Sequence, residues 1–375
     1  MKVIIVAGGT GGHIYPAIAI INKIKEKEPK SKFLYIGTSD RMEKDIIPKL
    51  GIDFVGIEMS GLSRKNIFKN GTVFKKFFKA VKRAEEEIKK FKPDIVIGAG
   101  GYITAPVLYA AHKLKVPTLI HEQNSIPGMS NKFIGSFADK ICVSLPNSIN
   151  LFPKKKTVYT GNPRSEEIIH VRKKNKKSLG FDENKKLVVF VMGSLGSTTM
   201  TEKLKKLIPM FSNKAYQVLV ITGKSYFDDY KNIELADNVK VVPFMEELIN
   251  LLKDSDLIVS RAGASTIAEI TAIGLPAILV PSPYVTNNHQ YKNAKELEDN
   301  GACHVIEEKD FTPQKVISEI DKIFDNKSAY DEMIENSKRL GIIDSATRIY
   351  EEARKIIGWY YVKWTCWFKY RKNRY

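Results

Sequence analysis

The sequence has few cysteines and no long apolar run. Its three cysteines, Cys142, Cys303 and Cys366, are odd in number and widely spaced, which excludes a disulfide framework. No apolar stretch approaches the ~18–20 residues that cross a bilayer, so we expect no membrane-spanning helix. The chain enters a strand-like run at Lys2 without an apolar signal segment. These absences predict a protein of the reducing cytoplasm.

Acidic residues are also scarce relative to basic ones. The chain carries 60 Lys and Arg against 42 Asp and Glu, a formal net charge of +18. Such a field attracts polyanions, namely nucleic acid, acidic lipid surfaces or phosphorylated substrates. High lysine usage that only maintains solubility is a further explanation. The net charge therefore favours an anionic partner but does not distinguish among nucleic acid, lipid surfaces and phosphorylated substrates.

Short apolar runs alternate with helical stretches along the chain, in two series. Continuous apolar runs bounded by turns are typical of parallel strands buried on both faces. A length of 375 residues also fits two domains of ~100–200 residues each. We therefore predict an α/β fold of two doubly wound, Rossmann-like domains facing a cleft. The runs are 3–6, 33–36, 95–97, 118–120 and 141–143 in the first series, and 187–191, 218–221, 239–242, 257–259 and 277–280 in the second.

The boundary between the domains is predicted near residue 163. Tyr159-Thr160-Gly161-Asn162-Pro163 and the lysine-rich stretch at 173–177 have the composition of a linker. The predicted parts are an N-terminal domain at 1–163, a C-terminal domain at 164–344, a helix at 345–357 that packs back on the first domain, and an aromatic and basic tail at 358–375.

Three glycine-rich loops follow predicted strands. They are Gly8-Gly9-Thr10-Gly11-Gly12-His13, Gly98-Ala99-Gly100-Gly101-Tyr102 and Met192-Gly193-Ser194-Leu195-Gly196-Ser197. Glycine lets a ligand approach the backbone closely, and amides at a helix start attract phosphate. Each loop alone is also explained as a tight strand-to-helix turn. Together they indicate a ligand rich in phosphates at the carboxyl ends of the strands.

The second domain carries two further polar segments. Glu269 lies about a turn and a half into the helix predicted after 257–259, where one carboxylate can accept hydrogen bonds from both hydroxyls of a ribose. The amide-rich run 287–291 suits sugar hydroxyls. An exposed helix residue and a plain capping loop are the alternative interpretations.

The sequence resembles the MurG family of N-acetylglucosaminyltransferases. The matching segments occur in the same order as in the family, over about residues 1–357. The matching segments are Gly8-Gly9-Thr10-Gly11-Gly12-His13, Gly100-Gly101-Tyr102, His121-Glu122-Gln123-Asn124, Gly161-Asn162-Pro163, Ser260-Arg261-Ala262-Gly263-Ala264 and Asn288-His289-Gln290-Tyr291-Lys292-Asn293-Ala294. The resemblance implies a glycosyltransferase-B fold. It also implies inverting transfer of N-acetylglucosamine from UDP-N-acetylglucosamine to undecaprenyl-diphosphate-linked muramyl-pentapeptide, a step of peptidoglycan synthesis.

The resemblance also implies roles for individual residues. Gly11 and Gly12, with Gly100, Gly101 and Tyr102, would bind the acceptor diphosphate. The residues implied at the donor are Thr10, Gly11, Gly12, Asn124, Arg164, Ser165, Ser194, Met245, Ala264, Ser265, Thr266, Ile267, Ala268, Glu269 and Gln290. Two positions depart from the family pattern. Met192 replaces a glycine, and the arginine after Gly161-Asn162-Pro163 comes one place early, with Ser165 in its slot.

A single displacement needs a base for the acceptor hydroxyl and stabilisation of the departing UDP. His13 and Glu122 are the candidate bases, with a hydrogen-bonded loop anchor as the alternative role of His13. No cofactor is required for this chemistry, and a divalent cation is left open. Asp254-Ser255-Asp256 matches a metal-binding Asp-x-Asp pattern, but its place between a helix end and a strand favours a surface turn.

A helical stretch from Phe74 alternates apolar and basic residues. Core packing explains its apolar stripe, and docking on an anionic membrane is the rival interpretation. The residues predicted to contact the membrane are Phe74, Lys75, Phe77, Phe78, Lys79 and Lys82. The tail at 358–375 holds all three tryptophans and suits either a bilayer interface or an unstructured extension. We expect a peripheral protein on the cytoplasmic face of the cell membrane.

Three other functions compete with this interpretation. A diacylglycerol galactosyltransferase shares the fold, but the segment at 121–124 favours the MurG-like interpretation over it. A UDP-N-acetylglucosamine epimerase shares the fold too, but it would need no basic stripe facing lipid. A nucleic-acid-binding protein would explain the charge. No recognised nucleic-acid module appears, however, and the aromatic residues among the cations form a helical stripe rather than a stacking sheet.

Overall fold

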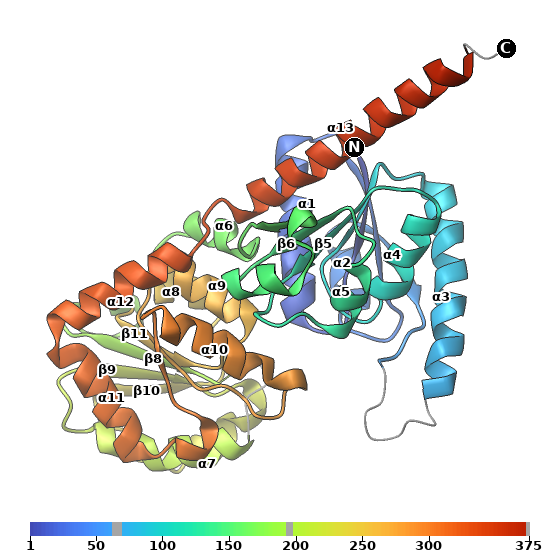
Figure 1. Ribbon diagram of the computed structural model, residues 1–375. Coiled ribbons are helices and arrows are strands. Elements are labelled where there is room, and N and C mark those ends of the chain that lie inside the picture. The colour runs from blue at the N-terminus through green and yellow to red at the C-terminus, as the bar shows by residue number, and fades with distance from the viewer. Residues whose placement is uncertain (62–69, 193–197, 373–375) are drawn as a thin grey trace. The chain divides into compact units, whose positions relative to one another are not determined.

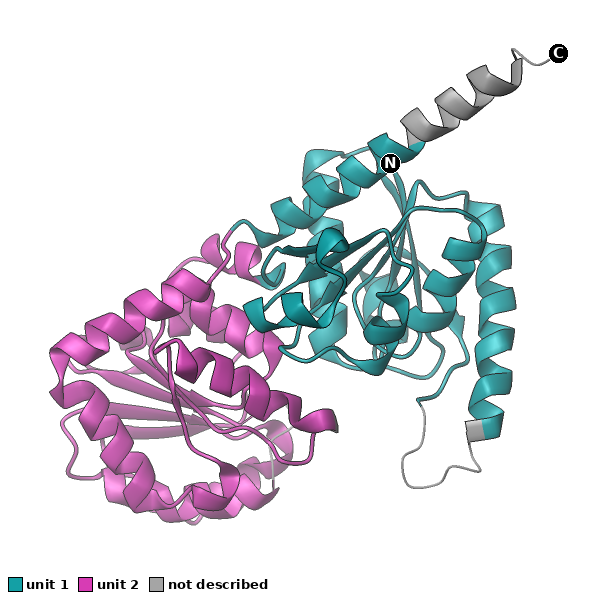
Figure 2. Cartoon of the chain, in the orientation of Figure 1, with its two compact units in different colours: residues 1–164, 344–375 teal, residues 165–343 magenta. Residues whose placement is uncertain are grey.

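The computed structural model describes residues 1–61, 70–192 and 198–372, without the side chains of 70, 286 and 361–372 (Figure 1). Ser194, which is predicted to bind the donor, lies outside the described residues. The chain forms two compact units. Unit 1 comprises Met1–Arg164 and Asp344–Tyr375, and unit 2 comprises Ser165–Ile343 (Figure 2).

Unit 1 is built on a parallel sheet of seven strands in the order β3-β2-β1-β4-β5-β6-β7. Its central strands are buried except for Lys2 at the start of β1, as the apolar runs predict for a sheet covered on both faces. The strands are β1 (Lys2–Val6), β2 (Lys32–Thr38), β3 (Asp53–Ile57), β4 (Ile95–Gly98), β5 (Thr118–Glu122), β6 (Lys140–Val143) and β7 (Thr157–Tyr159).

Helices cover both faces of this sheet (Figure 1). One core cluster contains residues of α3 and α4, and a second contains residues of α1 and α13. α13 is further tied to the unit because the Tyr350 hydroxyl donates to Glu28 and Lys140 pairs with Glu352. The helices are α1 (Gly11–Lys27), α2 (Glu43–Lys49), α3 (Asn70–Phe91), α4 (Thr104–Lys113), α5 (Met129–Ile134), α13 (Ser345–Lys372), and the 3-10 turns η2 (Pro146–Leu151) and η3 (Lys154–Lys156).

Unit 2 has a parallel sheet of six strands in the order β10-β9-β8-β11-β12-β13. The strands are β8 (Leu187–Val191), β9 (Gln217–Ile221), β10 (Val239–Val242), β11 (Leu257–Ser260), β12 (Ala277–Leu279) and β13 (His304–Val305). Its helices are α6 (Arg164–Ile169, whose first residue is in unit 1), α7 (Thr198–Leu207), α8 (Leu248–Leu252), α9 (Ala264–Ile273), α10 (His289–Asp299), α11 (Pro313–Asp325) and α12 (Lys327–Leu340), with the turns η4 (Lys176–Leu179), η5 (Ile208–Phe211), η6 (Lys224–Tyr230), η7 (Thr286–Asn288) and η8 (Glu308–Asp310).

Each sheet has a topological switch point, where successive strands are added on opposite sides. It lies between β1 and β4 in unit 1 and between β8 and β11 in unit 2. Open α/β sheets bind ligands outside the carboxyl ends of the strands at such a point. The loops after β1 and β4, and the start of α9 after β11, therefore occupy the ligand-binding positions of their units.

Within the part of the chain that the structure describes, none of the helices combines the length and the apolar character that crossing a membrane requires.

Candidate active site

The glycine loops after β1 and β4 pack backbone to backbone. The Gly8 amide donates to the Gly100 carbonyl at 3.3 Å. A Cβ on Gly101 would lie 2.4 Å from the Gly8 carbonyl oxygen. Gly9, Gly100 and Gly101 also have positive φ angles of 96°, 104° and 91°, which side chains disfavour. Glycine at these positions is thus required by the approach of the two loops.

The first loop leads directly into α1. Thr10 has an extended backbone at the N-cap of this helix and is exposed. The amides and dipole of a helix start favour an anion. Tyr102, from the second loop, lies beside the first, since a Cβ on Gly9 would be 4.0 Å from its ring. This end of unit 1 can hold a phosphate group against two loops at once.

His13 lies between the two loops. Its Nδ1 is 3.1 Å from the Gly8 carbonyl oxygen, which can only accept, so Nδ1 carries the proton in this contact. Thr10 Oγ1 lies 3.5 Å from the same nitrogen. The ring packs against Gly100, and the side chain is partly exposed. Nε2 is then the ring nitrogen able to accept a proton.

Glu122, the other candidate base, is 2% exposed. Its Oε1 accepts from the backbone and side-chain amides of Asn124 at 2.9 and 3.1 Å. Its Oε2 accepts from the Gly128 amide at 3.0 Å and from Asn131 Nδ2 at 2.9 Å. Three donors from the loop after β5 and one from α5 occupy the carboxylate, which therefore fixes the position of Asn124.

His121 is completely buried beside this loop. Its Nε2 lies 3.1 Å from the Gly161 carbonyl oxygen and 3.0 Å from Ser144 Oγ. Burial lowers the pKa of His121 to about 4, a shift that the Gly161 carbonyl opposes and the charge of His13 reinforces. A neutral imidazole thus holds the segment at 161–163 against β5.

Arg164 and Ser165 fall on different units. The Arg164 guanidinium lies over the ring of Tyr15, 5.6 Å from its centroid, in the first turns of α1. Ser165 is 2% exposed, and its hydroxyl donates to the Ala268 carbonyl at 3.3 Å. The displaced arginine thus has a place near the first glycine loop, while the serine in its expected slot supports α9.

In unit 2, α9 begins at the switch point with Gly263 as an extended N-cap. Ala264, Ser265 and Thr266 are partly exposed in its first turn, and Glu269 is partly exposed farther along. The helix start suits a diphosphate. Ile267 and Ala268 are instead buried in the core, so their side chains support the helix.

The loop before α9 is held by two buried polar contacts. Arg261 pairs with Glu308 at 2.6 Å, and Glu308 also accepts from the Thr199 hydroxyl at 2.6 Å. The Asn293 amide donates to the Ala262 carbonyl at 3.4 Å. Nothing in the sequence pattern indicates Glu308, because both of its partners are distant along the chain and Thr199 precedes it by 109 residues.

The remaining predicted donor residues of unit 2 are Gln290 in α10 and Met245 in a loop. The Ser282 amide donates to Gln290 Oε1 at 2.8 Å at the start of α10. Met245 is partly exposed in the loop after β10. The side-chain amide of Gln290 is thus oriented by a backbone contact.

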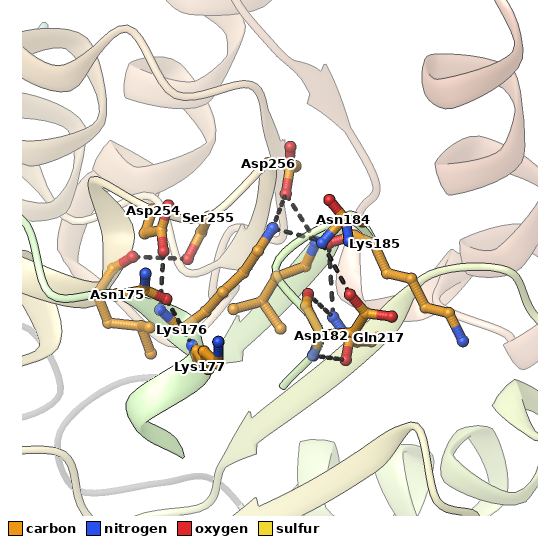
Figure 3. A network of polar contacts seen from close by, with 12 residues as sticks. Asn175, Lys176, Lys177, Asp182, Asn184, Lys185, Gln217, Asp254, Ser255 and Asp256 are labelled. Atoms are coloured by element: carbon orange, nitrogen blue, oxygen red, sulfur yellow. Dashed lines mark hydrogen bonds and ion pairs between the residues drawn. The ribbon is translucent and has the colours of Figure 1, made fainter. Parts of the chain in front are cut away.

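The Asp-x-Asp segment lies in a network of lysine contacts (Figure 3). Asp254 accepts from the Lys176 amide at 2.7 Å and pairs with Lys173 at 2.5 Å. Burial raises the pKa of Asp254, but the contacts with Lys173 and Lys176 outweigh burial and lower it overall. Asp256 pairs with the Lys176 ammonium at 3.3 Å and accepts from the Leu187 amide. Both carboxylates, and the stretch predicted as a linker, are thus part of the packing of unit 2.

No cluster of three or more His, Cys, Asp or Glu side chains suited to a metal ion occurs in the described ranges 1–61, 70–192 and 198–372.

The predicted membrane-contacting residues divide between two faces of α3. Phe74 and Phe78 are 58% and 65% exposed, and Lys75, Lys79 and Lys82 are exposed with them. Phe77 is half-buried against Tyr109 and Phe133, with ring centroids 6.2 and 6.3 Å away. α5 adds exposed Met129 and Phe133 to the outer surface. We call Phe74, Phe78, Met129, Phe133, Lys75, Lys79 and Lys82 the apolar-basic face.

Comparison with known proteins identifies both units. Residues 3–143 match the glycosyltransferase family 28 N-terminal domain, and residues 187–349 match its C-terminal domain. A UDP-N-acetylglucosamine–N-acetylmuramyl-(pentapeptide) pyrophosphoryl-undecaprenol N-acetylglucosamine transferase of Bacillus cytotoxicus is 44% identical over 362 residues, 95% of this chain and 100% of the relative. The enzyme of the same name from Bacillus pumilus is 43% identical over 361 residues, 95% of this chain and 99% of the relative.

Solved structures give a concordant result. The crystal structure of Acinetobacter baumannii MurG matches with a TM-score of 0.78 at 26% identity, covering 94% of this chain and 99% of that one. A putative UDP-N-acetylglucosamine 2-epimerase from Listeria monocytogenes matches with a TM-score of 0.69 at 16% identity, covering 93% and 94%. The second likeness shows the shared fold alone.

Proposed function

Since the chain belongs to glycosyltransferase family 28 and, within it, to the MurG transferases, we propose how its residues divide one reaction. The enzyme is a hexosyltransferase that moves N-acetylglucosamine from UDP-N-acetylglucosamine to the muramyl sugar of undecaprenyl-diphosphate-linked muramyl-pentapeptide in peptidoglycan synthesis. The full-length relatives at 43–44% identity carry this conclusion.

Unit 1 is proposed to bind the acceptor diphosphate. The amides of Gly11 and Gly12 at the start of α1, together with Gly100 and Gly101, form the binding surface, and Tyr102 borders it. The support is the contact between the two loops at the switch point. A helix start contributes ~0.3–1 kcal/mol to binding an anion at an exposed site, and more where the site is partly buried.

His13 is proposed as the general base. Its Nδ1–H faces the Gly8 carbonyl, which leaves Nε2 to take the proton of the acceptor hydroxyl as that oxygen attacks the anomeric carbon. The bond from that carbon to the UDP oxygen breaks on the opposite side, so the configuration at the anomeric carbon is inverted. Glu122 is the weaker candidate, because its four hydrogen bonds are all used to hold the loop.

Unit 2 is proposed to bind UDP-N-acetylglucosamine. The amides of Ala264, Ser265 and Thr266 at the start of α9 would hold the diphosphate and stabilise its charge as it departs. Glu269 would accept from the ribose hydroxyls, and the loop at Met245 would meet the uracil. Gln290 is proposed at the sugar, since Ser282 already fixes its orientation.

Three residues of unit 1 are also proposed to bind the donor. They are Thr10 and Asn124, each at an edge of the loops of unit 1, and Arg164, which Tyr15 holds near α1. Ser165 is proposed as a support of α9, because its hydroxyl is bonded to Ala268.

The apolar-basic face is proposed to dock unit 1 on the cytoplasmic surface of the membrane, where the lipid-linked acceptor is held. Aromatic side chains enter the interface, and each nearby cation contributes ~1 kcal/mol on anionic lipid. The exposure of Phe74 and Phe78 supports this proposal. Apolar surface exposed to water is unfavourable, and an exposed apolar patch often marks an interaction site.

The decisive assay offers radiolabelled UDP-N-acetylglucosamine and a short-chain polyprenyl-diphosphate muramyl-pentapeptide to the purified chain. We expect one labelled lipid disaccharide for each UDP released. Parallel reactions with diacylglycerol, with duplex DNA as a binding competitor, and with EDTA or added Mg²⁺ test the alternative acceptor, the nucleic-acid interpretation and the need for a divalent ion. Transfer to diacylglycerol alone, or UDP release without the disaccharide, would contradict the proposal.

A further inference from the structure

A carboxylate is buried directly beneath the first glycine loop. Glu43, the first residue of α2, is 0% exposed. Its Oε1 accepts from the Thr38 amide at 2.9 Å and from the Thr38 hydroxyl at 2.5 Å. Its Oε2 accepts from the Gly9 amide at 3.3 Å. The carboxylate therefore links the end of β2 to the loop that follows β1.

The surrounding residues leave room for this carboxylate only because they are glycines. A Cβ on Gly8 would lie 2.5 Å from Glu43 Oε1, and a Cβ on Gly37 would lie 2.7 Å from Glu43 Cγ. Neither glycine has a positive φ. Close approach to Glu43, rather than an unusual backbone angle, thus accounts for glycine at these two positions.

Two titratable side chains, Arg41 and Tyr35, lie near Glu43. Arg41 has a raised pKa, first through its hydrogen bond with Tyr102 and further through the charges of Asp40 and Glu43. Tyr35 has a pKa well above its usual value, mainly through burial and further through the charge of Glu43. Arg41 thus reaches Tyr102, a residue of the second glycine loop, from the turn that leads into α2.

Core packing alone gives no reason for a carboxylate at this place. Burying an ionised group is costly unless hydrogen bonds replace its water, and an apolar residue of similar size would avoid the cost. The hydrogen bonds of Glu43 are made to a strand end and a loop, both at the switch point. Its effect is to hold the Gly9 amide inward, just before the start of α1.

We propose that Glu43 is a positioning residue of acceptor binding, which holds the Gly9 peptide inward so that the amides at the start of α1 remain directed at the acceptor diphosphate. This inference rests on the proposed assignment of that loop to the acceptor. The effect should fall on the acceptor, because the amides of Gly11 and Gly12 are assigned to its diphosphate, whereas the groups assigned to UDP lie in unit 2.

The test compares Glu43→Gln with Glu58→Gln in the full-length enzyme. Glutamine keeps the size of Glu43 but replaces one of its two accepting oxygens with a donating NH2 group. The glutamine side chain therefore cannot accept hydrogen bonds from both Thr38 and Gly9 in the present geometry. Glu58 is an exposed residue of unit 1 that pairs with Lys76. Steady-state kinetics with varied acceptor and varied donor, UDP affinity by calorimetry, and amide hydrogen exchange of residues 7–14 are measured for each variant.

For Glu43→Gln we expect the KM for the acceptor to rise about tenfold or more, the loss that follows from removing a hydrogen bond to a charged group. The KM for UDP-N-acetylglucosamine and the affinity for UDP should stay within about twofold, and residues 7–14 should exchange faster. Thr38→Ser, which keeps the hydroxyl, should behave as wild type. Glu58→Gln should change none of these quantities.

Two results would overturn the inference. One is an unchanged acceptor KM together with unchanged exchange of residues 7–14. The other is an equal rise of both KM values that follows the loss of thermal stability, since that pattern indicates general support of the fold. Failure of the wild-type enzyme to use the muramyl acceptor would instead refute the proposed function, and the exchange measurement would still decide whether Glu43 holds the loop.

Discussion

His13 lies directly against Gly100. A Cβ at Gly100 would come within 2.4 Å of His13 Cδ2 and 3.0 Å of Nε2, so the proposed base and the second glycine loop fix each other's position. The contact joins segments nearly ninety residues apart along the chain. It exists because β1 and β4 are neighbours at the switch point.

Gly100→Ala should therefore impair both the fold and the chemistry. The left-handed φ of 104° and the overlap with His13 together cost about 2–4 kcal/mol of stability, and displacement of the imidazole should lower kcat. Thermal unfolding and transfer kinetics measure the two effects. Gly128→Ala is the matched control, because a Cβ there meets nothing within 4 Å. Equal behaviour of the two variants would disprove the constraint.

Replacement of the proposed base tests the chemistry separately. His13→Gln should lower kcat about 10²–10⁴-fold, the usual contribution of general base catalysis, and should leave the acceptor KM nearly unchanged. The pH profile of kcat in the variant should also lack one ionisation that the wild-type profile contains. A kcat within about threefold of wild type would reduce His13 to an anchor of the loop.

Much of the site could be predicted because it is encoded locally. An apolar strand, a glycine turn and a helix start occur within fifteen residues in the first loop, and the structure has β1 and α1 at these positions. Glu43 could not be predicted in this way. Its contacts to Gly9 and Thr38 depend on β1 and β2 lying side by side, and nothing in the spacing of residues 9, 38 and 43 indicates that contact.

Spacing was equally insufficient for the amphipathic stripe of α3. Its i, i+3, i+4, i+7 pattern groups Phe74, Phe77, Phe78 and Val81 on one side of the helix. In the structure Val81 is buried in the core, Phe77 is half-buried, and Phe74 and Phe78 are exposed. The stripe is wider than the contact with α4, so only packing decides which part of it remains outside.

The buried His121 predicts a pH dependence of stability. In the unfolded chain its pKa is near 6.5, and burial lowers it to about 4 in the folded protein. The unfolded state therefore binds the proton first, so its contribution is complete above pH 6.5 and is lost as pH falls towards 4. At about pH 5 the loss is roughly 2 kcal/mol. Urea unfolding of wild type and His121→Gln at about pH 7.5 and 5 should show this difference only in the wild type; parallel pH curves would contradict it.

Glu269 tests the donor half of the proposal. If its carboxylate accepts from both ribose hydroxyls, Glu269→Ala should weaken UDP binding about 10–100-fold, as expected for a lost hydrogen bond to a charged group. Calorimetry with UDP measures the change directly. Glu332→Ala, an exposed glutamate of α12 in the same unit, should bind UDP as wild type does. Unchanged binding in both variants would place the ribose elsewhere.

The apolar-basic face predicts a defect that appears only at a membrane. Lys75→Glu combined with Lys79→Glu replaces two exposed cations on α3, each contributing ~1 kcal/mol on an anionic surface. Affinity for vesicles rich in anionic lipid should therefore fall at least about tenfold, and more at low salt. Turnover of a short-chain, water-soluble acceptor should stay at the wild-type level, because neither lysine contacts the glycine loops.

Lys177→Glu combined with Lys309→Glu is the control for net charge, since these lysines are 72% and 70% exposed on unit 2 and pair only weakly with Glu183 and Glu307 at 3.3 Å. Phe78→Ser should reproduce the vesicle defect without altering charge, because it removes an aromatic side chain that is 65% exposed. If the double variant of unit 2 weakens vesicle binding as much as the double variant of α3 does, long-range charge accounts for the attraction. If only the α3 variants lose binding, the attraction depends on this face.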